Sequence, residues 1–283
     1  MSHVRIDVLQ RAARRGGYAI PHLLGGTTEL VVGQLRAAEQ LRSPLAFGFA
    51  PEVLPMIPLE IALPVTVSAA EHAAVPVATQ LEHTADFEMI VRAIRLGVSS
   101  VMFDGSQLPY EENVAGTAEV VRVANAFGVA VEAELGAVGG SAVRTQAPVE
   151  ALLTEPEAVV DFVARTGVHS LAVSFGNAHG TYATLPELDY DRVREICSLV
   201  DIPIVMHGGS GLTAEQYRHS IEAGISDIHC YTAIAVRAWD DVGNRISALD
   251  DTPPYHEIVG HTVDFFCENA LRIIEILGSR RTC

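Results

Sequence analysis

Short apolar runs alternate with longer amphipathic stretches along the whole chain, and this alternation restricts the folds that the sequence can adopt. Strands that are apolar at nearly every position are typical of a parallel sheet that helices cover on both faces. Several amphipathic stretches end in glycine, as helix C-termini often do. The apolar runs are residues 18–24, 44–50, 75–81, 99–105, 129–136, 170–176, 203–209 and 226–232. Eight such units in 283 residues predict an α/β fold of the TIM-barrel type, (β/α)8.

The alternation continues without a linker or a low-complexity segment, so residues 1–283 are expected to form a single barrel domain. After the eighth run, residues 256–277 have an amphipathic pattern that predicts an extra C-terminal helix. The N-terminal stretch has no apolar signal core, and no segment reaches the roughly 18 uninterrupted apolar residues of a membrane helix. We therefore expect no membrane partner.

The charge and the basic residues exclude several classes of function. A net charge of -16 argues against nucleic acid or an anionic membrane as a partner. All 19 basic residues are arginine, so no lysine can form the Schiff base of lysine-dependent aldolases or pyridoxal-phosphate enzymes. The four cysteines have no C-x-x-C spacing and are expected to be free thiols of a cytoplasmic protein.

Three histidines follow strand-like runs at the positions where barrel enzymes carry their chemistry, at the C-terminal ends of strands. His83 follows the third run, His179 follows the sixth, and His207 lies at the end of the seventh. Three neutral imidazoles that converge and leave a fourth position open are typical of catalytic zinc. Apart from His229, the other histidines, including His22 in the first run, lack this combination and are expected to be structural or exposed.

A glycine-rich turn adds a candidate anion site. The stretch HGGSG at residues 207–211 follows the seventh run and precedes a helix that begins near Thr213. The backbone N–H groups of such a turn and the N-terminus of the following helix favour an anion. Beside a metal-binding histidine, this turn suggests that a phosphate or a similar oxyanion is held near the zinc.

Four further stretches occur in a characteristic order and spacing: SVMFDGSQLPYEENV, VEAELGAVGG, GNAHGTY and HGGSGL. In these stretches the chain resembles the class II, zinc-dependent ketose-bisphosphate aldolases, which include the fructose- and tagatose-bisphosphate aldolases. The resemblance extends from RGGYAIP at residues 15–21 to the last helix. It implies a small sugar or sugar-phosphate substrate, a homodimer or homotetramer, and a zinc ion that acts as a Lewis acid and stabilises the enediolate left when a C–C bond breaks.

The resemblance also implies roles for individual residues. His83, His179 and His207 match the zinc ligands, while Asp104 and Glu134 match acidic positions that approach the metal. Glu82, directly before the first zinc histidine, matches the acid/base that moves a proton on the hydroxyl that becomes the aldehyde. The positions expected to bind substrate or phosphate, where a monovalent cation often assists, are Ser106, Gly180, Gly208, Gly209, Ser210 and Thr232.

Four positions depart from the pattern of that family. Glu82 stands where the family has aspartate, and residues 22–24 are His-Leu-Leu where it has Ala-Phe-Asn. His229 stands where the family has an asparagine that touches the enediolate, and it can act as a donor to a developing oxyanion. Near Val263 and Asp264 the chain lacks the arginine expected to meet the second phosphate of a bisphosphate.

The retained metal positions and the changed substrate-facing positions favour a zinc aldolase with an altered substrate, in which Glu82 and His229 are the catalytic residues. Two other functions stay open. One is a zinc-enolate enzyme with a different outcome, such as an epimerase, an isomerase or a C–C bond enzyme of specialised metabolism. The other is a non-catalytic ligand-binding relative. An ordinary bisphosphate aldolase that has drifted in sequence is also compatible with these motifs.

Overall fold

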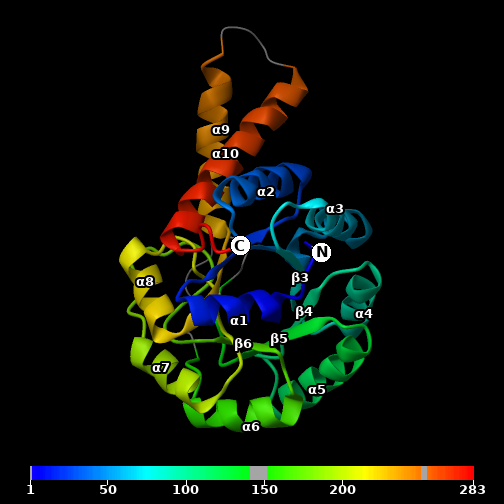
Figure 1. Cartoon of the computed structure of the whole chain (residues 1–283), viewed down its shortest axis with the longest axis vertical. Helices are drawn as coiled ribbons and strands as arrows, with labels where there is room; N and C mark the ends of the chain where they lie inside the picture. The colour runs from blue at the N-terminus through cyan, green and yellow to red at the C-terminus, as the bar shows by residue number, and fades with distance from the viewer. Residues whose placement is uncertain (1, 141–151, 250–253) are drawn as a thin grey trace.

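The structure is a computed structural model that describes residues 2–140, 152–249 and 254–283. Within these residues eight parallel strands close into a barrel in sequence order, with β8 paired to β1 (Figure 1). The strands are β1 (Ile20–Leu24), β2 (Leu45–Phe49), β3 (Val77–Thr84), β4 (Ser100–Phe103), β5 (Ala130–Leu135), β6 (Ser170–Val173), β7 (Ile204–Met206) and β8 (Ile225–Cys230). Each one overlaps a predicted apolar run, although β3 extends to Thr84, three residues beyond its run, and the predicted barrel is confirmed.

A ring of helices surrounds the barrel, because each strand is followed by an amphipathic stretch that packs its apolar face on the sheet. These helices are α2 (Thr28–Leu41), α3 (Leu59–His72), α4 (Phe87–Arg95), α5 (Tyr110–Ala126), α6 (Pro156–Thr166), α7 (Tyr190–Leu199), α8 (Ala214–Ala223) and α9 (Thr232–Ser247). The main apolar core fills the layer between strands and helices, where Phe47, Phe49 and Phe162 are fully buried.

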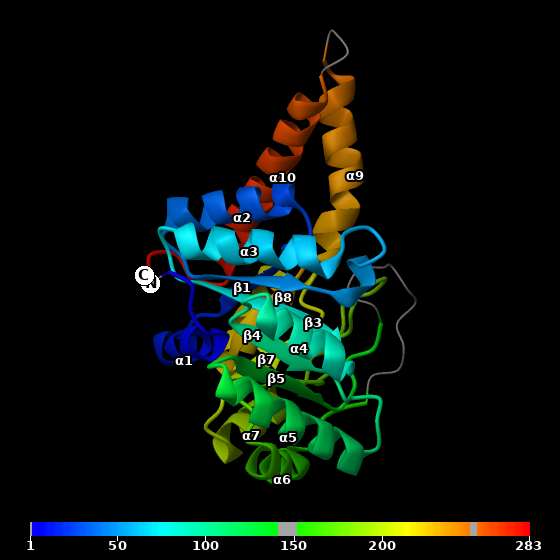
Figure 2. The same cartoon turned by 90° about the vertical axis from the view of Figure 1, so that its right-hand side faces the viewer.

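Helix α1 (Ile6–Gly16) covers the amino-terminal end of the barrel (Figure 2). Its residues Ile6 and Leu9 belong to an apolar cluster with Ile20 of β1. Gln10 of the same helix reaches into the barrel, where its Nε2 donates to Asp227 Oδ2 at 2.8 Å. Because one end is covered in this way, the carboxyl-terminal end of the strands is the place to look for a site.

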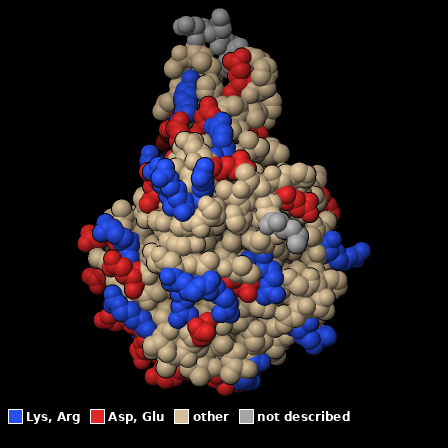
Figure 3. All heavy atoms as spheres, viewed as in Figure 1, with Lys and Arg blue, Asp and Glu red and all other residues tan. Residues whose placement is uncertain are grey.

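Helices α9 and α10 (Tyr255–Ile276) lie side by side and project beyond the barrel (Figures 1 and 2). Helix α10 is the predicted extra C-terminal helix, and it also packs against α2. Charges of both signs mix on the projecting helices, where Arg245 pairs with Asp241 and Glu268. Figure 3 shows the same mixture of arginine and carboxylate side chains over the face that it views.

Two features concern the chain as a whole, the length of its apolar helices and the state of its cysteines. No helix in the described ranges is long and apolar enough to cross a membrane. The four cysteines are free, as predicted, with Cys230 and Cys267 buried and Cys283 exposed.

Candidate active site

Three histidine side chains meet at the carboxyl-terminal end of the barrel. His83 lies on β3, His207 directly follows β7, and His179 lies in the loop after β6. One nitrogen of each ring lies within 4.8 Å of the other two, and His83 Nε2 is 2.8 Å from His207 Nδ1. The Nε2 atom of His179 is buried and has no hydrogen-bond partner among the described residues. Three imidazole nitrogens that face one small volume fit a metal ion.

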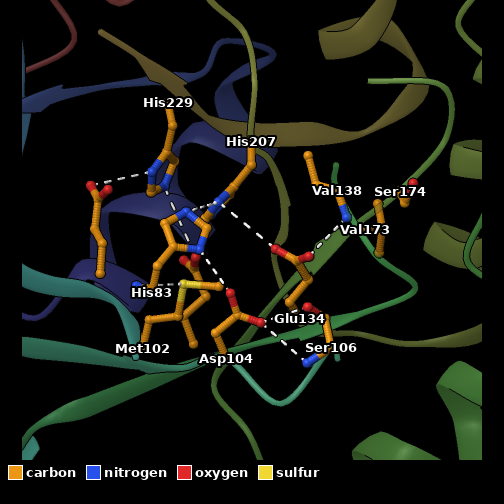
Figure 4. Close-up of polar contacts among 12 residues, drawn as sticks. His83, Met102, Asp104, Ser106, Glu134, Val138, Val173, Ser174, His207 and His229 are labelled. Carbon is orange, nitrogen blue, oxygen red and sulfur yellow. Dashed lines mark hydrogen bonds and ion pairs between the residues drawn. The ribbon is translucent and has the colours of Figure 1, made fainter. Parts of the chain in front are cut away.

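Carboxylates hold two of these rings from the far side. His83 Nδ1 is hydrogen-bonded to Asp104 Oδ2 at 3.0 Å, and His207 Nε2 to Glu132 Oε1 at 2.9 Å. Asp104 in turn accepts from the backbone N–H and the hydroxyl of Ser106 (Figure 4). Hydrogen bonds of this kind orient a histidine ring and select the nitrogen that faces a metal. The carboxylates behind the histidines therefore also fit a metal centre.

The ionisable groups of this cluster lie close together in a small buried volume, so they shift one another's pKa values. Burial lowers the pKa of His83, but the hydrogen bond and the charge of Asp104 outweigh it and raise the pKa to about 9. Burial, followed by the charge of His83, lowers the pKa of His207 to about 3. Burial, followed by repulsion from Asp104, raises the pKa of Glu134 to about 8. A bound cation would lower the pKa values of these groups, because it favours neutral imidazoles and ionised carboxylates.

Glu134 and Asp104 take different places around the histidines. Glu134 Oε1 accepts from the backbone N–H of Val138 at 2.9 Å, whereas its Oε2 is buried without a partner in the described part of the chain. That free oxygen lies 4.0 Å from His207 Nδ1. Both predicted acids therefore lie beside the histidines, but Glu134 offers an unused oxygen and Asp104 supports His83.

A backbone irregularity explains how two consecutive residues, Glu82 and His83, border the same pocket. Successive side chains of a regular strand point to opposite faces. His83 has a φ of 31°, in the left-handed region that residues with a side chain rarely adopt. The pairing of β3 with β4 shifts register between Leu81 and Thr84. A bulge of this kind re-aims side chains, and strained backbone of this kind clusters at functional sites.

Glu82 extends into the barrel interior over Gly48 of β2. A Cβ at position 48 would lie 1.6 Å from Glu82 Oε1, so only glycine leaves room for this carboxylate. The same oxygen lies 3.3 Å from His22 Nε2 and 3.4 Å from His229 Nδ1. The extra methylene of glutamate thus carries the carboxylate to a position between two histidine rings.

One pocket connects the histidine cluster with the glycine-rich turn. It is lined by His83 and His179, and also by Glu82, His229, Gly208, Ser210 and Thr232. Ser210 Oγ accepts the backbone N–H of Tyr231 at 2.7 Å, and Thr232 is the first residue of α9. A polar turn and a helix N-terminus therefore border the same pocket as the histidines, which favours an anionic group there.

The other predicted phosphate-binding residues have different surroundings. Ser106 lines a second pocket, which also borders His83 and His179 but does not include Ser210. The backbone N–H of Gly209 donates to the carbonyl of His229 at 3.0 Å. Gly180 directly follows His179 and has a φ of 102°. Binding of substrate by these residues stays a prediction.

Comparison with known proteins identifies the family. The family model of class-II fructose-bisphosphate aldolase matches residues 4–282. The chain belongs to this family. It is 33% identical over 262 residues to the uncharacterized protein YdjI of Escherichia coli K12, a match that covers 93% of this chain and 92% of YdjI. Family membership supports an aldolase-type lyase activity for this class II chain.

Solved structures agree with this assignment. The crystal structure of the YdjI aldolase matches with a TM-score of 0.87 and 30% identity, over 98% of both chains. A putative fructose-1,6-biphosphate aldolase from Coccidioides immitis matches with a TM-score of 0.87 and 30% identity, over 97% of this chain and 96% of that one. Fructose-bisphosphate aldolase from Campylobacter jejuni, at 21% identity and a TM-score of 0.78 over 100% of this chain and 97% of that one, shows the shared fold.

Within this class II aldolase barrel, three buried polar residues were not assigned a role from the sequence: His22, Glu132 and Asp227. His22 Nδ1 lies 3.4 Å from Asp227 Oδ2, and its ring is 3.7 Å from that of His229 on the neighbouring strand β8. The available signal was spacing, because Asp227 lies two residues before His229 and therefore shares its inward face.

Polar side chains form a continuous row of contacts through the aldolase barrel. It runs from Gln10 of α1 through Asp227 and His22 to His229, whose ring stacks on that of His207 at 4.0 Å. By contrast, the position near residue 264 that departs from the expected family pattern lies away from this row of polar contacts. Asp264 pairs there with Arg36 at 2.6 Å on the surface.

Proposed function

We propose that the chain is a zinc-dependent aldolase that catalyses reversible retro-aldol cleavage of a ketose or ketose phosphate, with a non-standard substrate. One observation carries this proposal: Glu82, His83 and His179 border one pocket, and His207 belongs to the same histidine cluster. A carboxylate that can transfer a proton and histidines that can bind a metal ion therefore border the same pocket. Family membership supports the reaction class.

His83, His179 and His207 would hold the ion, with Glu134 as a fourth ligand. When bound, zinc would polarise the ketone oxygen of the substrate and offset negative charge that develops there. The Glu82 carboxylate takes the proton of the hydroxyl that becomes the aldehyde and returns it in the condensation direction. Burial lowers the pKa of His229 well below its usual value, so its neutral ring donates an N–H to a developing oxyanion.

The lining of the pocket supports a substrate with one anionic group or none. Ser210, Thr232 and the N-terminus of α9 favour an anion, and a monovalent cation would assist a phosphate there. None of the described residues that line this pocket is an arginine. A second phosphate, which arginine usually clamps in a fork of hydrogen bonds, lacks such a partner in this pocket.

Chelation and one substitution test the proposal. Removal of metal should abolish cleavage of a ketose and ketose-phosphate panel, and added Zn2+ should restore it. The Glu82→Gln variant should lose about 10²–10⁴-fold in kcat because the acid/base is gone. Glu88→Gln, an exposed glutamate on α4, is the matched control and should retain activity. Full activity after chelation would show that the reaction needs no metal, and silence of Glu82→Gln with no turnover of any substrate would favour a ligand-binding protein.

One contact favours a second candidate, an epimerase or isomerase that uses the same enolate chemistry. Glu82 Oε1 and His229 Nδ1 are 3.4 Å apart, so two groups that can carry a proton border the same pocket. NMR in deuterated buffer separates the two reactions. Deuterium incorporation next to the carbonyl without C–C cleavage would favour the epimerase, and release of an aldehyde would favour the aldolase.

We further propose that residues 1–283 form one catalytic domain that assembles as a cytoplasmic homodimer or homotetramer. Trp239 is 84% exposed and Val236 is 47% exposed on the projecting helix α9. Exposed aromatic and apolar side chains on a projecting element are typical of a surface that a partner covers. Light scattering should give two or four times the 30.3 kDa chain mass, whereas a monomer would contradict the assembly.

A further inference from the structure

A second group of metal-binding atoms lies beside the three zinc histidines, deeper in the barrel. His22, Glu82 and His229 each offer one ligand atom that lies within 4.8 Å of the other two. All three residues are buried, and His22 Nε2 and His229 Nδ1 lack a hydrogen-bond partner in the described ranges. A buried nitrogen without a partner costs free energy, so two of them beside one carboxylate need an explanation.

The spacing of these atoms fits a shared ion better than hydrogen bonds. Glu82 Oε1 is 3.3 Å from His22 Nε2 and 3.4 Å from His229 Nδ1, and neither pair forms a hydrogen bond. The neighbouring contact between His83 and Asp104, at 3.0 Å, is a hydrogen bond. Atoms that lie about 2.0–2.1 Å from a tetrahedral zinc ion are roughly 3.3–3.4 Å apart. The two distances from Glu82 Oε1 thus match the separation of neighbouring ligands on such an ion.

The negative charge of the barrel interior also favours a bound cation. Five carboxylates lie in or around the histidine clusters: Glu82, Asp104, Glu132, Glu134 and Asp227. Within the described residues their ion-pair partners are all histidines, and the chain contains no lysine. Buried carboxylates need nearby positive charge. A divalent ion at His83, His179 and His207 would supply part of that charge, and an ion beside Glu82 would supply more.

We propose that His22, Glu82 and His229 form a second site for a divalent transition-metal ion, distinct from the site at His83, His179 and His207. All three residues line the pocket, so an ion held there keeps an open position toward it. Two imidazoles and one carboxylate suit Zn2+, Fe2+ or Co2+. Gly48 is part of this site, because a side chain there would displace Glu82.

Occupancy of the second site has a consequence for catalysis, which rests on the proposed function. An ion there makes Glu82 a ligand and withdraws its carboxylate from proton transfer. Metal would then activate at the first site and inhibit at the second. Binding at the second site does not depend on the reaction, so metal binding and activity test different statements.

Metal binding is measured on the full chain with Zn2+ or Co2+ as the probe, by equilibrium dialysis and elemental analysis. The wild type should bind two ions per chain, and His22→Gln should bind one. His72→Gln, an exposed histidine on α3, is the matched control and should keep two. One ion in the wild type, or two in folded His22→Gln, would overturn the proposal.

Anomalous diffraction from wild-type crystals soaked in Zn2+ locates the ions without any substitution. A second peak among His22, Glu82 and His229 supports the site, and a single peak at the other histidines under saturating metal refutes it. In the activity assay, the kcat of the wild type should rise as the first ion binds and fall by about 10²-fold as the second ion binds. His22→Gln should lack the fall, and a further rise in the wild type would overturn the inhibitory consequence.

Discussion

Replacement of Gly48 by alanine tests whether the position of the Glu82 carboxylate controls the reaction. The new Cβ would lie 1.6 Å from Oε1 and 2.5 Å from Cδ of Glu82, and 3.1 Å from His22 Nε2. Gly48 is not among the residues with positive φ, so alanine fits the backbone without strain. The perturbation is therefore steric, and it falls on the carboxylate rather than on the zinc histidines.

The expected magnitude follows from the size of this overlap. The carboxylate must retreat by roughly 2 Å to reach ordinary van der Waals contact. A misplacement of about 1 Å can cost about 10²-fold in rate, and a general acid or base contributes about 10²–10⁴-fold. We therefore expect Gly48→Ala to lower kcat by about 10²–10⁴-fold. The end of a flexible side chain can move, so the stability cost should stay within the roughly 1–3 kcal/mol typical of overpacking.

The assay is steady-state cleavage of the best ketose substrate, combined with zinc analysis and thermal melting. Gly48→Ala should retain metal at His83, His179 and His207 and should remain folded while losing kcat. Gly26→Ala is the matched control, because its Cβ would meet Val53 at an ordinary 3.7 Å. Wild-type kcat in folded Gly48→Ala would refute the reasoning that the space over Gly48 positions the acid/base.

The proposed metal site gives two further predictions. In the metal-free protein, burial followed by repulsion from nearby carboxylates raises the pKa of Glu132 and of Glu134 to about 8 from 4.5. The stability that these groups contribute is present below about pH 4.5 and is lost as pH rises through 8. Zinc binds more tightly as pH rises, because its ligands must lose protons. The difference in Tm between zinc-loaded and chelated protein should therefore widen from about pH 6 to 8.5. A constant or narrowing difference in scanning fluorimetry would contradict this prediction. Glu132→Gln should weaken zinc binding about 10–100-fold by releasing His207, and unchanged affinity in a chelator competition would remove that supporting role.

The barrel was predictable because its strands are apolar on both faces. The runs around Phe47 and Phe49, or around Leu171 and Val173, carry that signal in any local window. The convergence of His83, His179 and His207 was predictable for a related reason, since a strand end in a parallel barrel fixes which end of the molecule a residue occupies. Both inferences need only local sequence and the symmetry of the fold.

The contacts of Glu82 were not predictable in this way. His22 and His229 are 207 positions apart, and they become neighbours only through the register of β1 against β8, which closes the barrel. His22 therefore looked like an isolated histidine in an apolar run. The left-handed backbone of His83 has no sequence signature either, because glycine is the residue that usually marks such a conformation.

Glu82 is one methylene longer than the aspartate that the resemblance predicts at this position, and its surroundings in the barrel interior accommodate that length. A longer carboxylate needs space, which Gly48 provides, and it needs partners, which His22 and His229 provide. Such an interior gives up apolar contacts at the centre of the barrel, so its stability must come mainly from the layer between strands and helices. Because that outer layer packs separately from the central side chains, the barrel can hold a cluster of ionisable residues at its centre.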